Sequence, residues 1–156
     1  MFLVLLTLAF VIGSADSHVV ILSGTDQKVW DPFTFIFQIT CNLYNKPAYW
    51  YNVQFLENDF LFSGEWITKR FEERMTPGTI SRIYKGAMNG DEPFSDGYSV
   101  TAIFNHDCTS NGEKVEAQFE FKTRCPLQRP CNMKYHADLT NQKGHKSVFD
   151  NVIVIL

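Results

Sequence analysis

Phe33–Cys41 (FTFIFQITC) is the stretch that decides the fold, because its side chains alternate in character along the chain. One face of this stretch is apolar throughout and is made by Phe33, Phe35, Phe37, Ile39 and Cys41. The opposite face, made by Thr34, Ile36, Gln38 and Thr40, is largely polar. A period of two is typical of a β-strand with one buried face. We therefore predict a strand whose aromatic face lines the core.

The same alternation recurs further along the chain. It is clearest in Glu113–Thr123, where Val, Ala and Phe alternate with Glu, Gln and Lys. Further strands are expected at Tyr49–Leu56, Thr79–Tyr84, Tyr98–His106, Asn132–Leu139 and Ser147–Leu156. The last of these is apolar on both faces at its end, which is typical of a central strand covered on both sides. Seven to eight short strands separated by turns predict an all-β fold, an antiparallel β-sandwich.

One segment departs from the period of two. In Gly64–Met75, the apolar residues Ile67, Phe71 and Met75 recur every four positions, and Lys69 and Glu73 have the spacing of a helical ion pair. The spacing predicts one short helix here, which Pro77-Gly78 would end.

The N-terminus has the pattern of a secretory signal. Phe2–Ile12 is an unbroken apolar run, and small residues follow it at Gly13-Ser14-Ala15. The run is too short to span a bilayer, which requires about 20 apolar residues. We predict a signal peptide over residues 1–17, one domain over residues 18–156 and a protein secreted to the extracellular space.

Composition restricts the partners of this domain. The chain has 45% hydrophobic residues and 14 Phe, which is enough to fill one core, and its net charge is −3. A slightly acidic chain without a Lys/Arg cluster does not fit nucleic acid or an anionic membrane surface. No later segment is long and apolar enough to be a transmembrane segment. We expect no cofactor.

The four cysteines are Cys41, Cys108, Cys125 and Cys131. An even number behind a secretory signal predicts two disulfides. Strand parity favours Cys41–Cys108 with Cys125–Cys131, whose loops would contribute about 4 and about 2 kcal/mol to the free energy of unfolding. The parity of Cys125 with Phe119 and Phe121 leaves Cys41–Cys125 with Cys108–Cys131 as an alternative.

Several motifs of the chain, in order, resemble the transthyretin-like family of secreted nematode proteins. They are Cys41-Asn42 with Lys46-Pro47-Ala48, Val53–Asp59, Tyr98–Cys108, Pro130-Cys131 and Phe149–Leu156. The chain departs from that family at Leu43-Tyr44-Asn45, where the family has one Gly, and it carries the extra Cys125. The resemblance implies a transthyretin- or Ig-like sandwich of a divergent member, and it implies secretion. It supplies no ligand.

Candidate catalytic and metal-binding residues do not form a convergent set in the sequence. His106-Asp107-Cys108 contains a thiol and a base, but neighbouring residues on a strand point to opposite faces. His18, His106, His136 and His145 lack metal-site spacing, and Asp91-Glu92, Asp96 and Asp107 offer only scattered oxygen ligands for Ca²⁺. Transthyretin-related hydrolases of 5-hydroxyisourate end in Tyr-Arg-Gly-Ser, which this chain lacks. We predict neither catalytic nor metal-binding residues.

The candidate interface is aromatic. Tyr49, Trp50 and Tyr51 follow one another, and Trp66 lies close behind in the sequence. Aromatic side chains on a surface are common anchors of protein interfaces, although the same residues could cover the core edge. Our hypothesis is a secreted binding or signalling protein whose extracellular protein or lipid partner contacts its surface. The alternatives are a carrier of a small apolar or lipid ligand, which needs an internal cavity, and a secreted hydrolase.

Overall fold

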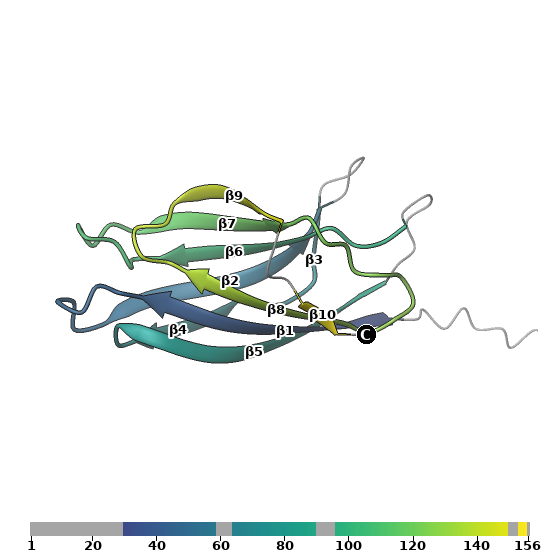
Figure 1. Cartoon of the computed structure of the whole chain (residues 1–156), viewed down its shortest axis with the longest axis horizontal. Coiled ribbons are helices and arrows are strands. Elements are labelled where there is room, and N and C mark those ends of the chain that lie inside the picture. Colours follow the sequence, from purple (N-terminus) through teal and green to yellow (C-terminus); the bar gives the residue numbers. More distant parts are fainter. Residues whose placement is uncertain (1–29, 59–63, 90–95, 150–152, 156) are drawn as a thin grey trace, which may run out of the picture.

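The described part of the chain is all-β, as predicted. The computed structural model describes residues 30–58, 64–89, 96–149 and 153–155 (Figure 1). The predicted signal peptide lies outside these residues. The strands are β1 (Trp30–Cys41), β2 (Tyr49–Glu57), β3 (Glu65–Trp66), β4 (Phe71–Met75), β5 (Gly78–Asn89), β6 (Val100–His106), β7 (Val115–Phe121), β8 (Cys131–Asp138), β9 (Gly144–Val148) and β10 (Ile153–Ile155). Within the described ranges no helix is long and apolar enough to cross a membrane.

The strands form two sheets. The first sheet has the order β10-β8-β1-β5, and the second has the order β3-β2-β6-β7-β9, with β4 also paired to β2. Two pairs, β1 with β8 and β7 with β9, are parallel, whereas the prediction was an antiparallel sandwich. The parallel pairs arise because the chain changes sheets between β7 and β8, and again between β8 and β9, so each returning strand enters in the direction of its neighbour.

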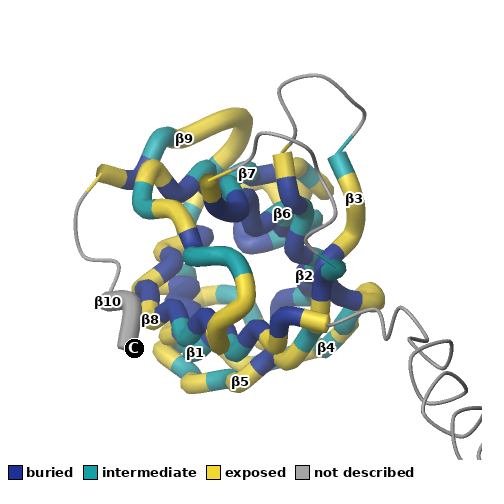
Figure 2. The backbone as a smooth tube through the Cα atoms, turned by 90° about the vertical axis from the view of Figure 1, so that its right-hand side faces the viewer, coloured by how far each residue is buried: buried dark blue, intermediate teal, exposed yellow. Residues whose placement is uncertain are grey.

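Figure 2 shows buried positions, in dark blue, along strands of both sheets. Many of these buried residues are aromatic and belong to one core cluster. The inward face of β1 is that predicted from the alternation, and each of its five residues is at most 1% exposed. The ring of Phe35 stacks on that of Phe55 from the second sheet, with 3.8 Å between ring centroids. Phe37 contacts rings of both sheets, among them Phe104 and Phe121 of the second sheet and Tyr135 of its own. The two sheets therefore pack face to face on shared rings.

The helix predicted over Gly64–Met75 is wrong. The segment contains β3 and β4, and β4 pairs with β2 from Tyr49↔Met75 to Val53↔Phe71. Phe71, Glu73 and Met75 are half-buried, while the two residues between them are exposed. A spacing of four is even, so a strand also places these residues on one face. Pairing with β2 decides between the two geometries.

The prediction for Ser147–Leu156 as one central strand is also wrong. Ser147 belongs to β9, which pairs with β7 in the second sheet. Ile153–Ile155 forms β10 in the first sheet, where it pairs with β8. Among the described strands β10 lies at the edge of its sheet. The change from one sheet to the other falls within this segment, so an apolar run did not indicate a continuous strand.

The two disulfides lie at opposite ends of β1. Cys41, the last residue of β1, is bonded to Cys108 after β6, with 6.0 Å between Cα atoms. Cys125 is bonded to Cys131, which lies beside Phe33 near the start of β1. This is the pairing that strand parity favoured. The first disulfide joins the two sheets, and the second closes the short loop that precedes β8.

The Phe37→Ala variant should lower the free energy of unfolding by about 3–5 kcal/mol, because it removes a buried ring that contacts both sheets. Gln38→Ala, one residue along on the exposed face, should change it by about 0.5 kcal/mol or less. Urea denaturation of both variants measures the difference. Equal effects of the two substitutions would contradict the inward orientation of Phe37.

Two buried tyrosines offer a second, matched test. Burial raises the pKa of Tyr49 and of Tyr51 to about 12, so both hydroxyls are neutral at neutral pH. The Tyr51 hydroxyl lies 3.1 Å from that of Tyr84, whereas the Tyr49 hydroxyl has no hydrogen-bond partner among the described residues. Tyr49→Phe should therefore be neutral or stabilise by about 1 kcal/mol, while Tyr51→Phe should destabilise by about 1 kcal/mol. Thermal and urea unfolding should rank the two variants in this order.

Candidate functional site

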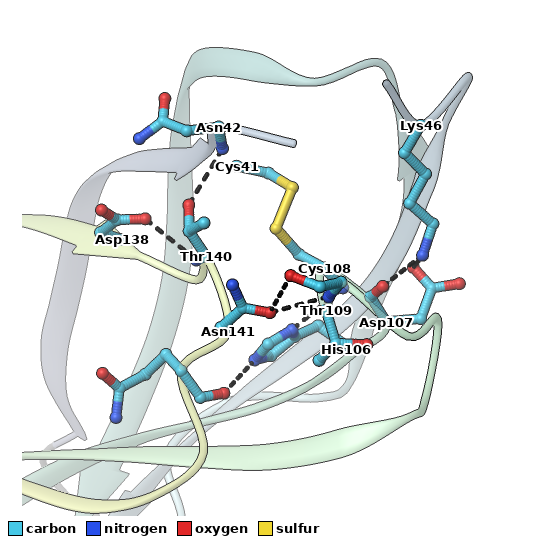
Figure 3. Close-up of a disulfide and its surroundings, with 12 residues drawn as sticks. Cys41, Asn42, Lys46, His106, Asp107, Cys108, Thr109, Asp138, Thr140 and Asn141 are labelled. Atoms are coloured by element: carbon cyan, nitrogen blue, oxygen red, sulfur yellow. Dashed lines mark hydrogen bonds and ion pairs between the residues drawn. A yellow bond between two sulfur atoms is a disulfide. The ribbon is translucent and has the colours of Figure 1, made fainter. Parts of the chain in front are cut away.

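Three loops meet around the Cys41–Cys108 disulfide (Figure 3). Residues 42–48 join β1 to β2, residues 107–114 join β6 to β7, and residues 139–143 join β8 to β9. We call these three loops the loop end. Loops carried by a packed scaffold are where binding residues concentrate, and loops cluster at the ends of β-sandwiches. The loop end is therefore the first place to look for a binding site.

His106 holds the third loop against the disulfide. Its side chain is fully buried, with Nε2 2.9 Å from the Gln142 carbonyl and Nδ1 accepting a hydrogen bond from the Cys108 N–H at 3.2 Å. Since Nδ1 is an acceptor, Nε2 carries the proton and the ring is neutral. Burial lowers the pKa of His106, while the hydrogen bond to Gln142 acts in the opposite direction.

Asp107 holds the first loop against the second. Its carboxylate accepts a hydrogen bond from the Trp50 N–H at 2.7 Å and lies 3.3 Å from the Lys46 ammonium. Its backbone N–H donates to the Trp50 carbonyl at 3.1 Å, and its own carbonyl accepts from Lys46. His106 and Asp107 are thus both occupied by neighbouring residues, and the sulfur of Cys108 lies in a disulfide. These three residues form no nucleophile–base pair.

Asn141 connects the third loop to the second. It has a left-handed backbone with φ of 55°, which asparagine tolerates better than most residues. Its side-chain oxygen accepts hydrogen bonds from the N–H and the hydroxyl of Ser110, at 2.7 and 3.0 Å. Its own N–H donates to the Cys108 carbonyl at 2.9 Å. These contacts join the backbone of the third loop to that of the second.

Two open hollows lie between these loops. One, of about 400 Å³, is lined by Thr109, Ser110, Asn111, Glu113, Val115, Asn141 and Lys143. The other, of about 300 Å³, is lined by Leu43, Asn45, Lys46, Pro47, Thr109, Ser110, Asn111 and Gly112. The two hollows share the segment from Thr109 to Asn111 as their common wall. Tyr44, 74% exposed, belongs to the first loop. The walls therefore combine hydroxyl, amide and charged groups with apolar surface from residues such as Leu43, Pro47 and Val115.

The predicted aromatic interface is not one patch. Tyr49 and Tyr51 are at most 1% exposed and point into the core, so neither can contact a partner. Trp50 lies on the outer face of the second sheet, where its Nε1 donates to Glu72 at 2.7 Å and the Lys114 ammonium lies 4.5 Å from its ring. Trp66, 51% exposed, lies opposite Leu56. Trp50 and Leu56 are six positions apart on β2, so the two tryptophans are separated by about 20 Å along the strand.

No metal site forms among the described residues, where no group of three or more His, Cys, Asp or Glu side chains converges. His136 bonds to Thr40 at 2.7 Å, and His145 to Glu120 at 2.9 Å. Of the acidic residues considered for Ca²⁺, Asp96 pairs with Arg124 and Asp107 with Lys46. His18, Asp91 and Glu92 lie outside the described residues.

Sequence reasoning named Cys41, His106, Asp107 and Cys108 but missed Ser110, Asn141 and Gln142. Each of the missed residues joins loops that are 30 or more positions apart in the chain. The one local signal was the turn chemistry of Thr140-Asn141, since Asn favours turns and left-handed backbone. That signal predicts a turn, but it does not predict which other loops the turn contacts.

Comparison with known proteins gives a family and nothing closer. A family model described as Caenorhabditis elegans protein of unknown function (DUF870) matches residues 36–150, a range that contains all three loops. A search of curated proteins gave no match, and a search of solved structures gave none either.

The His106 pKa has a consequence for stability. In the unfolded chain a histidine has a pKa of about 6.5, and in the folded protein burial lowers the pKa of His106. Between these two values the unfolded chain binds more protons, so this contribution is complete above about pH 6.5 and is lost as the pH falls toward the folded pKa.

His106→Gln removes the titrating ring and keeps an amide that can donate to the Gln142 carbonyl. The decrease in unfolding free energy between about pH 7 and about pH 5 should be smaller in this variant than in the wild type. Urea denaturation at each pH measures both slopes. Identical slopes would show that His106 does not titrate differently in the two states.

Proposed function

The chain belongs to the DUF870 family, whose function is unknown, and we propose from the structure of this member that it is a secreted binding protein whose loop end contacts an extracellular protein. The observation that carries the proposal is the set of contacts that join the three loops of the loop end to one another. The disulfide, the buried ring of His106 and the Asn141 amide fix its three loops. Loops fixed before binding lose little conformational entropy when a partner binds.

The lining of the hollows supports a protein partner over a lipid. The walls present hydroxyl and amide groups at Thr109, Ser110 and Asn111 and opposite charges at Glu113 and Lys143. Such groups pair with the polar rim of a protein interface, whereas a lipid chain requires an apolar cleft. The contacts between rings of the two sheets likewise favour binding at the surface over a ligand carried inside.

We also propose a fold type, an extracellular location and a non-enzymatic role for this protein, each on separate grounds. We propose a transthyretin-like sandwich, supported by the order of sequence motifs together with two face-to-face sheets. Secretion is supported by the apolar run at Phe2–Ile12 and by two disulfides, which persist in oxidising compartments. A non-enzymatic role is supported by the structural use of His106, Asp107 and Cys108.

A pair of matched substitutions tests the proposal. Asn111→Arg places a long cation between the two hollows, and Gln128→Arg makes the same kind of change on the exposed Cys125–Cys131 loop at the opposite end. Both variants and the wild type would be recovered from the medium of a secreting host and used to capture partners from extracellular extract. We expect one protein to be captured by the wild type and by Q128R, with at least tenfold less captured by N111R.

Two results would contradict the proposal. One is equal capture of the same protein by all three forms, which would place the contact outside the loop end. The other is retention of the wild type inside the host cell in reduced form, which would exclude secretion. Circular dichroism of N111R provides the control for folding, since Asn111 is exposed and its replacement should leave the β-sheet signal unchanged.

A further inference from the structure

β5 is a long and regular edge strand. It spans 12 residues and pairs with β1 one-to-one from Trp30↔Asn89 to Cys41↔Gly78, without a bulge. Among the described strands nothing pairs with its other side. Edge strands present unpaired backbone groups to another chain unless proline, a bulge, charge or a covering segment blocks them.

The direction of the free backbone groups follows from one hydrogen bond. The Ala87 N–H donates to the Ile67 carbonyl, which lies outside the first sheet, so Ala87 faces away from β1. In agreement, Ala87 lies opposite Pro32, which has no N–H to give to a ladder. Hydrogen-bonded and non-hydrogen-bonded pairs alternate along an antiparallel ladder. The backbone N–H and C=O groups of Thr79, Ser81, Ile83 and Lys85 therefore point away from β1, as those of Ala87 do.

The same four residues form a self-complementary row. All are exposed on the outer face of the first sheet, and Ile83, 62% exposed, lies at its centre. Lys85 is the one charged member, and Ser81 lies at the equal distance on the other side of Ile83. One of these outward groups, the Ser81 carbonyl, accepts a hydrogen bond from the Arg82 guanidinium at 2.9 Å.

We propose that two copies of this chain pair through β5 as antiparallel strands, about a two-fold axis at Ile83. In this register Ile83 lies opposite its symmetry mate, and each Ser81 lies opposite Lys85 of the other copy. A register centred on Lys85 would place two ammonium groups opposite each other, and like charges in directly opposed positions are unfavourable. The new ladder would end before Ala87, because the Ala87 N–H already donates to the Ile67 carbonyl.

Arg82 is compatible with this pairing, because the Ser81 carbonyl that it contacts can accept a second hydrogen bond from the other copy. It lies on the other face of β5, where both oxygens of Glu73 hold its guanidinium at 3.0 and 2.8 Å. The positive charge of Arg82 is therefore already neutralised by Glu73 on the inner face of β5. This interface is separate from the loop end and does not depend on what the loop end binds.

Charge substitutions at Ser81 test the register in both directions. Ser81→Glu places a carboxylate opposite Lys85 twice per dimer, and Ser81→Lys places a second ammonium there. Sedimentation of the full secreted protein at low salt should give a dimer dissociation constant on the order of tenfold lower for S81E and tenfold higher for S81K. High salt should reduce both changes. Ile83→Lys should leave a monomer.

The matched controls are Gln118→Glu and Gln118→Lys, on the outer face of the second sheet, which should leave the dissociation constant unchanged. Hydrogen exchange adds a readout independent of charge: the amides of Ser81, Ile83 and Lys85 should exchange more slowly as protein concentration rises. Circular dichroism confirms that each variant is folded.

Three results would overturn the proposal. They are a wild-type protein that sediments as a monomer at high micromolar concentration, changes of the same sign in S81E and S81K, and a dimer that persists in Ile83→Lys. The last two would place any self-association on another surface.

Discussion

The inward row of β1 is the constraint on which the rest of the structure depends. Phe37 contacts rings of Phe55, Phe104 and Phe121 from the second sheet and of Tyr84 and Tyr135 from its own. Burying such rings drives the two sheets together, since it removes a large apolar area from water. No other described ring has as many ring neighbours. The positions of both sheets relative to each other are therefore set at the middle of one strand.

Each end of β1 is attached to a neighbouring loop. At the C-terminal end of the strand, the disulfide joins Cys41 to Cys108 and so attaches β1 to the loops that meet there. Near the start, the buried carboxylate of Asp31 accepts hydrogen bonds from the Tyr98 hydroxyl and the Gln128 N–H, at 2.6 and 2.8 Å. The second pair of contacts fixes the short loop closed by Cys125 and Cys131. The loops at both ends of β1 are thus attached to a strand that the aromatic core holds in place.

Prediction from the sequence succeeded where one face of a strand is exposed to solvent and the other is buried. Phe33–Cys41 and Glu113–Thr123 have that alternation, and their buried faces are the predicted ones. It failed at Gly64–Met75 because a four-residue spacing fits a strand and a helix equally. Alternation also separated Trp50 from Tyr49 and Tyr51 without indicating which face was buried. The parallel pairing of β1 with β8, and the meeting of Asn141 with Ser110, depend on long-range contacts that no local pattern carries.

The Cys41–Cys108 bond also encloses the chain between its two half-cystines. The ring spans 67 positions and includes every connection from β1 through β6. A protease that cuts one peptide bond anywhere in that ring opens it without releasing a fragment, because the sulfur–sulfur bond still links the two pieces. The Cys125–Cys131 bond gives the same protection to the loop before β8. A single cleavage at either place would leave one covalent molecule, still held together by the core.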